Sequence, residues 1–121
     1  CTLSYPDNLS QRLDRAFHAD LHTLLELDSH YGLWLGAALK QQFEEWKNWP
    51  DLIASHGHTI WHKPQAGYTL QIGNGQAIHA ITGLPVIYDF RMLDVLLGGQ
   101  GAPLVPVGDQ YLFGEYLSCL N

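Results

Sequence analysis

Cysteine is scarce in this chain of 121 residues, and its two cysteines, Cys1 and Cys119, stand at opposite ends. Two such residues make no disulfide framework, and without a Cys-x-x-Cys pair they predict neither a zinc site nor a redox motif. A reduced, cytosolic setting is the simpler expectation. Long apolar runs are missing as well. None approaches the ~20 residues of a membrane-spanning helix, so we expect no membrane span.

Basic residues are also few, because six Lys and Arg stand against twelve Asp and Glu, for a net charge of −6 at pH 7. Too few cations are present to neutralise a run of phosphates, so the composition argues against nonspecific nucleic-acid binding. The rest of the composition is ordinary. With 46% hydrophobic and 15% charged residues, the chain resembles globular proteins rather than disordered ones.

Residues 1–50 have a mainly helical pattern. After a strand end over residues 1–5, closed by Pro6, the apolar residues of a first helix recur every four positions: Leu9, Leu13 and Phe17. Asp7 or Asn8 can cap this helix. A longer helix is expected from Asp20 to about Trp46. Its apolar face should hold Leu21, Leu24, Tyr31, Leu35, Ala38, Gln42 and Trp46.

Two features of the longer helix indicate close packing. Gly32 and Gly36 lie four residues apart, and each costs a helix about 1 kcal/mol relative to Ala, which suggests that another backbone approaches there. The tryptophans of the chain are Trp34, Trp46, Trp49 and Trp61. They could stack on sugars or form a subunit interface, but packing in a core or interface is their more ordinary role.

Residues 51–121 alternate between strand and helix patterns. The expected strands cover residues 51–61, 68–72, 85–90 and 116–120, and the first two form a hairpin around the turn at 63–67. A helix is expected from an Asn74 cap to Thr82, and Gly83 should end it. Further helices are expected over 91–97 and in part over 106–113. This alternation predicts an α/β layer structure.

A His-Gly-His-Thr motif runs from His56 to Thr59. Residues two apart on a strand share a face, so His56 and His58 should project together. Neutral imidazoles both donate and accept hydrogen bonds, which suits sugar hydroxyls, and Gly57 lets a ligand or second backbone approach. Two alternatives stay open: the histidines bond only to neighbouring backbone, or His56, His58 and His62 bind zinc.

The motif Asp89-Phe90-Arg91 follows a strand of the buried type. In open α/β sheets, ligands bind at the carboxyl ends of the strands. The guanidinium of Arg91 can hold a carboxylate or phosphate, while Asp89 holds a hydroxyl or orients a neighbour. A purely structural ion pair between Asp89 and Arg91 is the alternative.

A glycine-rich turn spans Gly98, Gly99, Gln100, Gly101, Ala102 and Pro103. Its backbone N–H groups can approach an anion or a sugar oxygen. The turn lacks the Lys-Ser/Thr end of a P-loop and the spacing of a dinucleotide fingerprint. A helix-ending turn that needs positive φ is the more ordinary explanation of these glycines.

In their order and spacing these motifs resemble the bacterial anhydro-N-acetylmuramic acid kinases. The series is Ser-His-Gly-x-Thr from Ser55, Gly-Tyr-Thr-Leu-Gln-Ile-Gly from Gly67, Thr-Gly-Leu-Pro from Thr82, Asp-Phe-Arg from Asp89 and Gly-Gly-Gln-Gly-Ala-Pro-Leu-Val-Pro from Gly98. The match runs from roughly Tyr5 to Asn121. Many relatives carry Gln where this chain has His58, so the role of that position is less defined.

The resemblance implies a two-lobed fold of the sugar kinase, actin and heat-shock ATPase type. This chain would be a single incomplete α/β domain of the first lobe, with a mixed sheet and flanking helices. Residues 1–50 would form its mainly helical part and residues 51–121 its substrate-cleft part. Since the chain begins at Cys1 without a methionine, we expect an internal piece of a longer protein. The family's phosphate loop would precede it, and the catalytic Asp would follow it.

The resemblance also implies an activity: conversion of 1,6-anhydro-N-acetylmuramic acid to N-acetylmuramic acid 6-phosphate with ATP, Mg²⁺ and water, in a cytoplasmic bacterial enzyme that is typically a homodimer. No catalytic residue would lie within this chain, which alone should be inactive. The residues expected to bind the sugar are His56, Gly57, His58, Thr59, Asp89, Arg91, Gly99, Gln100, Gly101 and Ala102.

Two other functions stay open. The first is a non-catalytic sugar-binding module derived from such a kinase, which would bind ligand without depending on ATP. The second is a metal-dependent hydrolase that uses His56, His58 and His62, which would contain stoichiometric zinc and lose activity to chelators.

Overall fold

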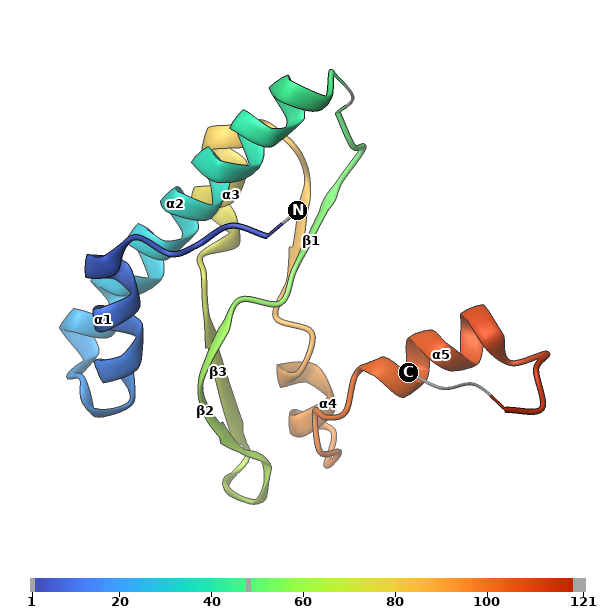
Figure 1. Ribbon diagram of the computed structural model, residues 1–121. Coiled ribbons are helices and arrows are strands. Elements are labelled where there is room, and N and C mark those ends of the chain that lie inside the picture. Colours follow the sequence, from blue (N-terminus) through green and yellow to red (C-terminus); the bar gives the residue numbers. More distant parts are fainter. Residues whose placement is uncertain (1, 48, 119–121) are drawn as a thin grey trace.

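The computed structural model describes residues 2–47 and 49–118 (Figure 1). Its helices are α1 (Asp7–Arg15), α2 (Leu21–Trp46), α3 (Gly75–Thr82), α4 (Met92–Leu96) and α5 (Val105–Phe113), with 3₁₀ turns η1 (Ala16–His18) and η2 (Pro64–Ala66). Its strands are β1 (Ile53–Ser55), β2 (His58–Lys63), β3 (Tyr68–Ile72) and β4 (Val86–Tyr88). The predicted α/β class is confirmed, with parallel and antiparallel strands and flanking helices.

The two N-terminal helices are confirmed, but the start of the first differs from the prediction. Pro6 is the N-cap of α1, and Asp7 stands inside the first turn, so neither Asp7 nor Asn8 caps the helix. Pro6 has the fixed φ that suits a helix start. Residues 2–5 form no strand, which corrects that expectation for the part of 1–5 that is described. Phe17 is exposed, because α1 gives way to η1 before it.

Helix α2 begins at its expected cap, since the Asp20 side chain accepts a 2.8 Å hydrogen bond from the Thr23 backbone N–H. Hydrogen bonds from Thr23 lower the pKa of the Asp20 carboxyl. The apolar face was predicted only in part. Leu21 and Trp46 are exposed, because they are the first and last residues of the helix. The buried residues of α2 are Leu24, Leu27, Tyr31, Gly32, Gly36 and Phe43.

The close approach predicted at the two helical glycines is confirmed. A Cβ on Gly32 would lie 2.6 Å from the Asn74 carbonyl oxygen and 2.9 Å from the Asn74 nitrogen. A Cβ on Gly36 would lie 2.9 Å from the Cβ of Ile81. Helix α3 therefore lies directly against α2, as Figure 1 shows.

Asp28 fixes the start of α3 against α2. Its carboxylate accepts hydrogen bonds from the Gly73 N–H at 2.8 Å and the Asn74 side-chain amide at 3.0 Å. Asn74 caps α3 as predicted, since its Oδ1 accepts from the backbone N–H groups of Gln76 and Ala77. Gly83, in the left-handed region, ends the helix where expected.

The strands form two separate pairs. β1 and β4 are parallel, with Ile53 opposite Val86, whereas β2 and β3 form an antiparallel hairpin around η2. A single strand over 51–61 was therefore the wrong prediction, because the chain leaves one pair at Ser55 and enters the other at His58. The strand predicted over 85–90 is present over Val86–Tyr88 but is not fully buried, since one neighbouring strand covers it in the described part of the chain.

Two buried clusters hold these elements together. One joins α1, α2 and the hairpin through Leu9, Leu13, Ala16, Leu24, Leu27, Tyr31, Ile60 and Ile72. The other joins α2, β1 and α3 through Phe43, Ile53 and Ile78. The hairpin and β1 thus both pack on α2, through different clusters, which fixes the segment between them.

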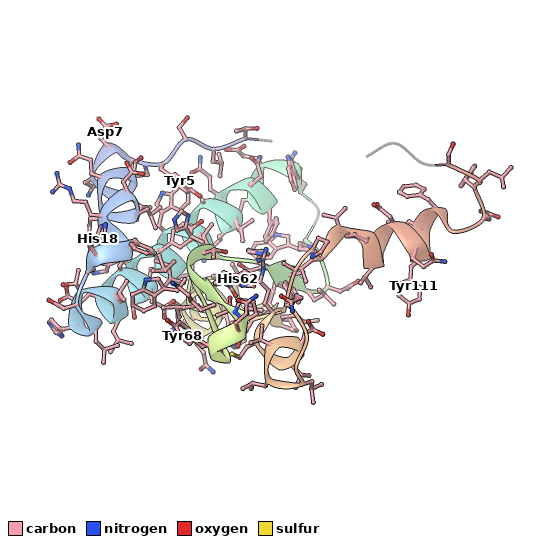
Figure 2. The ribbon with its side chains drawn as sticks, turned by 90° about the horizontal axis from the view of Figure 1, so that it is seen from below. Tyr5, Asp7, His18, His62, Tyr68 and Tyr111 are labelled. Carbon is pink, nitrogen blue, oxygen red and sulfur yellow. The ribbon has the colours of Figure 1, made fainter. Side chains whose placement is uncertain are left out.

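The C-terminal part of the described chain projects outward. Figure 1 shows α5 extending away from the other elements, and none of its residues is buried. Tyr111, which is 87% exposed, points away from the molecule in Figure 2. Helices over 91–97 and 106–113 are confirmed as α4 and α5. The strand predicted over 116–120 is absent at 116–118, and its remainder lies outside the described residues. Within 2–47 and 49–118, no helix has the length and apolarity needed to cross a membrane.

The first prediction concerns helix packing. Gly32→Ala should lower the free energy of unfolding by about 1–3 kcal/mol. The added methyl would collide with backbone atoms of Asn74, which cannot move away by a side-chain rotation. Gly108→Ala in α5 is the matched control, since nothing lies within 4 Å of a Cβ there. Urea unfolding of the full-length protein measures both changes. Equal tolerance of the two substitutions would contradict the packing described here.

A second prediction tests the Asp28 carboxylate. Asp28→Ala should lower the free energy of unfolding by about 2 kcal/mol, because the Gly73 N–H and the Asn74 amide lose a charged acceptor. Glu26→Ala, two residues away, is the control. Its exposed 3.7 Å contact with His22 should contribute less than about 1 kcal/mol. If the melting temperatures of the two variants fall by the same amount, Asp28 does not anchor α3.

Candidate functional site

Two parallel strands end side by side at one edge of their sheet. Ser55, the last residue of β1, is paired with Tyr88, the last residue of β4. His56 directly follows the first strand, and Asp89 directly follows the second. Carboxyl ends of adjacent parallel strands are where ligands bind in α/β folds. The structure thus places the starts of the two predicted polar motifs at one such edge.

His56 and Arg91 contact each other there. The Arg91 Nε–H donates a 3.1 Å hydrogen bond to Nε2 of His56. A nitrogen that accepts carries no proton, so the His56 ring is neutral, with its proton on Nδ1, 3.2 Å from the Gly57 carbonyl oxygen. The alternative of an Asp89–Arg91 ion pair is wrong, because the two side chains form no salt bridge among the described residues.

Gly57 separates the two histidines. Its φ is +75°, and a Cβ at this position would collide with the carbonyl oxygen of Ile72. The close approach expected at Gly57 is thus made by the backbone of β3. His56 and His58 do not share the face of one strand, because the left-handed turn at Gly57 ends the extended backbone between them.

His58 and Thr59 belong to the hairpin instead. They are paired with Ile72 and Gln71 of β3, and both are half-buried. The His58 ring lies edge-on to the Tyr31 ring at 6.4 Å. Burial of Tyr31, with a 3.0 Å hydrogen bond to the Tyr5 hydroxyl, raises the pKa of Tyr31. His58 therefore stands next to a tyrosine that stays neutral.

The zinc alternative is not supported by the histidine positions. Nδ1 of His62 lies 3.0 Å from the Thr69 hydroxyl, and His56 bonds to Arg91. Among residues 2–47 and 49–118, no three His, Cys, Asp or Glu side chains are placed to hold one metal ion. The structure thus does not bring His56, His58 and His62 together.

The glycine-rich turn is folded around a carboxylate that sequence reasoning missed. Gly101 N–H donates a 2.7 Å hydrogen bond to Oδ2 of Asp94, and Gly99 lies directly against the same carboxylate. Gln100 is exposed and Ala102 is half-buried. Asp94 could have been predicted from its place shortly before this turn, because aspartate side chains commonly accept hydrogen bonds from nearby turn amides.

Two hollows flank the segment that follows β4. A cavity of about 290 Å³ lies among α2, the hairpin and α4, and Asp89 is the one predicted site residue that lines it. Gln71 also lines this cavity, and its side-chain carbonyl oxygen is buried with no hydrogen-bond partner in the described structure. A shallower hollow is lined by His56, Phe90 and Val107. Asp89 and Phe90 thus line different hollows, and Asp89 has φ +59°.

The four tryptophans form no common platform. Trp34 stacks on Tyr31, and Trp61 donates to the Phe17 carbonyl oxygen at 3.3 Å. Trp46 and Trp49 both lie near Phe43. Trp34 and Trp61 thus have the packing role expected for them, whereas Trp46 and Trp49 contact Phe43 but remain exposed.

Comparison with known proteins gives one consistent family. The family profile described as Anhydro-N-acetylmuramic acid kinase matches residues 2–119. The kinase of that name from Gloeothece citriformis is 34% identical over 94% of this chain, and the one from Shewanella sediminis is 43% identical over 87%. The one from Acinetobacter baylyi is 57% identical over 50% of this chain.

These matches cover only part of each relative: 32% of the Gloeothece citriformis protein, 30% of the Shewanella sediminis protein and 16% of the Acinetobacter baylyi protein. The family has the sugar kinase and ATPase type of fold, in agreement with the α/β elements described above. Because the family profile matches nearly the whole chain, the protein belongs to the anhydro-N-acetylmuramic acid kinase family.

Proposed function

We propose that this chain is part of an ATP-dependent kinase that converts 1,6-anhydro-N-acetylmuramic acid to N-acetylmuramic acid 6-phosphate. In this reaction, water activated by a carboxylate base attacks the anomeric carbon, the bond from that carbon to the bridging oxygen breaks, and the 6-oxygen receives the phosphoryl group. Family membership supports the reaction class. The role proposed for this chain is to form one wall of the sugar site.

ATP and Mg²⁺ do not fit the residues of this chain. The glycine-rich turn has no Lys-Ser/Thr end, and its Gly101 N–H is already bonded to Asp94. The described residues also bring no three metal-ligating side chains together. We therefore place the nucleotide, the metal ion and the base on other parts of the complete kinase and assign no step through them to this chain.

The observation that carries the proposed sugar wall is the His56–Arg91 contact at the carboxyl edge of β1 and β4. Arg91 uses Nε for His56, which leaves the two terminal nitrogens of its planar fork outside that hydrogen bond. Such a fork suits a planar carboxylate, and the lactyl carboxylate of N-acetylmuramic acid is such a group. Arg91 would thereby orient the sugar.

The other predicted residues would have supporting roles. Asp89 is exposed and lines the open cavity beside α2, where its carboxylate can accept from a hydroxyl group. Thr59 and His58 would stiffen the hairpin edge next to Gly57. Gly99, Gln100, Gly101 and Ala102 would shape the backbone that follows α4, with Asp94 holding the turn.

One prediction tests Arg91 in the complete kinase. Arg91→Ala should raise KM for the anhydro sugar about 10- to 100-fold, as expected for one lost charged pair, and leave KM for ATP within about twofold. Steady-state kinetics with each substrate varied measures both. Arg15→Ala is the control, since Arg15 is an exposed arginine of α1. An unchanged sugar KM, or an equal rise in both constants, would rule Arg91 out as a sugar ligand.

Another prediction concerns the chain by itself. The 121-residue polypeptide should show no ATP-dependent phosphorylation of the anhydro sugar, because the base and the phosphate site are placed elsewhere. A coupled ADP-release assay detects turnover. Turnover that survives repurification would refute this division of roles. ATP-independent sugar binding by the complete protein, without turnover, would favour the binding-module alternative.

A further inference from the structure

We infer that His56 is a positioning residue that acts on the sugar through Arg91, an inference that rests on the proposed function. Arginine carries several donors on a long flexible side chain, so the direction of its fork depends on what holds Nε. Here Nε is held by a neutral imidazole nitrogen at 3.1 Å. The hydrogen bond directs Nε–H toward His56, at the end of β1, and does not involve the two terminal nitrogens.

The backbone around Gly57 sets the acceptor. Nδ1 of His56 faces the Gly57 carbonyl oxygen at 3.2 Å, which selects the tautomer with a bare Nε2. That carbonyl is oriented by the left-handed turn at Gly57, which no larger residue can adopt without meeting the Ile72 carbonyl oxygen. The turn at Gly57 therefore orients the imidazole of His56, which in turn orients the guanidinium of Arg91. We call these two hydrogen bonds, Gly57–His56 and His56–Arg91, the relay.

The role of His56 requires an acceptor. Arginine can only donate hydrogen bonds, so the side chain that faces Nε of Arg91 must offer a bare nitrogen or an oxygen at the position of Nε2 of His56. A substitution that keeps an acceptor there should keep the direction of the guanidinium, and one that removes the acceptor should not.

The first test is a double-mutant cycle on sugar KM in the complete kinase. His56→Ala should raise KM about three- to tenfold, the ratio that one hydrogen bond of ordinary strength supports. The same substitution in an Arg91→Ala background should add no further change, because the residue through which His56 acts is gone. An equal rise in both backgrounds would mean that His56 acts independently of Arg91 and would overturn the inference.

The second test uses a conservative variant. His56→Gln keeps an acceptor oxygen near the position of Nε2, so its sugar KM should stay near the wild-type value, whereas His56→Ala raises it. His18→Gln, in η1, is the control and should leave the sugar KM unchanged.

The outcomes separate this inference from the proposed function. If Arg91→Ala leaves sugar KM unchanged, the proposed sugar wall fails. If Arg91→Ala raises KM but His56→Gln raises it as much as His56→Ala does, the wall stands and an acceptor at that point does not position Arg91. That result overturns the relay.

Discussion

At Gly57 the chain leaves the parallel pair of strands and enters the hairpin, and the carbonyl oxygen of Ile72 occupies the space that a side chain would need. This one steric constraint has consequences on both sides. Before the turn, His56 is free of the strand and meets Arg91. After it, His58 pairs with β3 and lies against Tyr31. The candidate site and the hairpin therefore depend on the same backbone conformation.

The position of that turn depends in turn on α2. Gly32 and Gly36 let α3 lie against this helix, and Asp28 holds the residues that join β3 to α3. Ile60 of β2 and Tyr31 of α2 share one buried cluster, while Ile53 of β1 and Phe43 of α2 share another. The strands before and after Gly57 are thus both anchored on α2, so a change in helix packing would shift the turn and the site with it.

Local signals explain what could be predicted from the sequence. The Asp20 cap, the Asn74 cap and Gly83 mark the ends of α2 and α3, because capping is decided by a few neighbouring residues. The close approach at Gly32 was predictable for a similar reason, since glycine inside a helix has a cost that packing offsets. The sequence also identified His56 and Asp89 as candidate site residues, because each is a polar residue that directly follows an apolar strand pattern.

Long-range pairing explains what could not be predicted. Residues 51–61 look like one strand, and only the separate partners Val86 and Ile72 show that there are two. Arg91 stands two residues from Asp89 in sequence, yet it bonds to His56, 35 positions away. The Asp94 contact with Gly101 gives the glycine-rich turn a structural cause that its composition did not reveal. Each of these depends on where distant segments meet.

We propose that the carboxyl edge of β1 and β4 presents Arg91, held by His56, to the sugar. A crystal structure of the complete kinase with 1,6-anhydro-N-acetylmuramic acid bound tests it most directly. The account predicts the sugar carboxylate on the terminal nitrogens of Arg91, with Nε still bonded to Nε2 of His56. A sugar bound away from this edge, or an Arg91 turned from His56 in the complex, would contradict it.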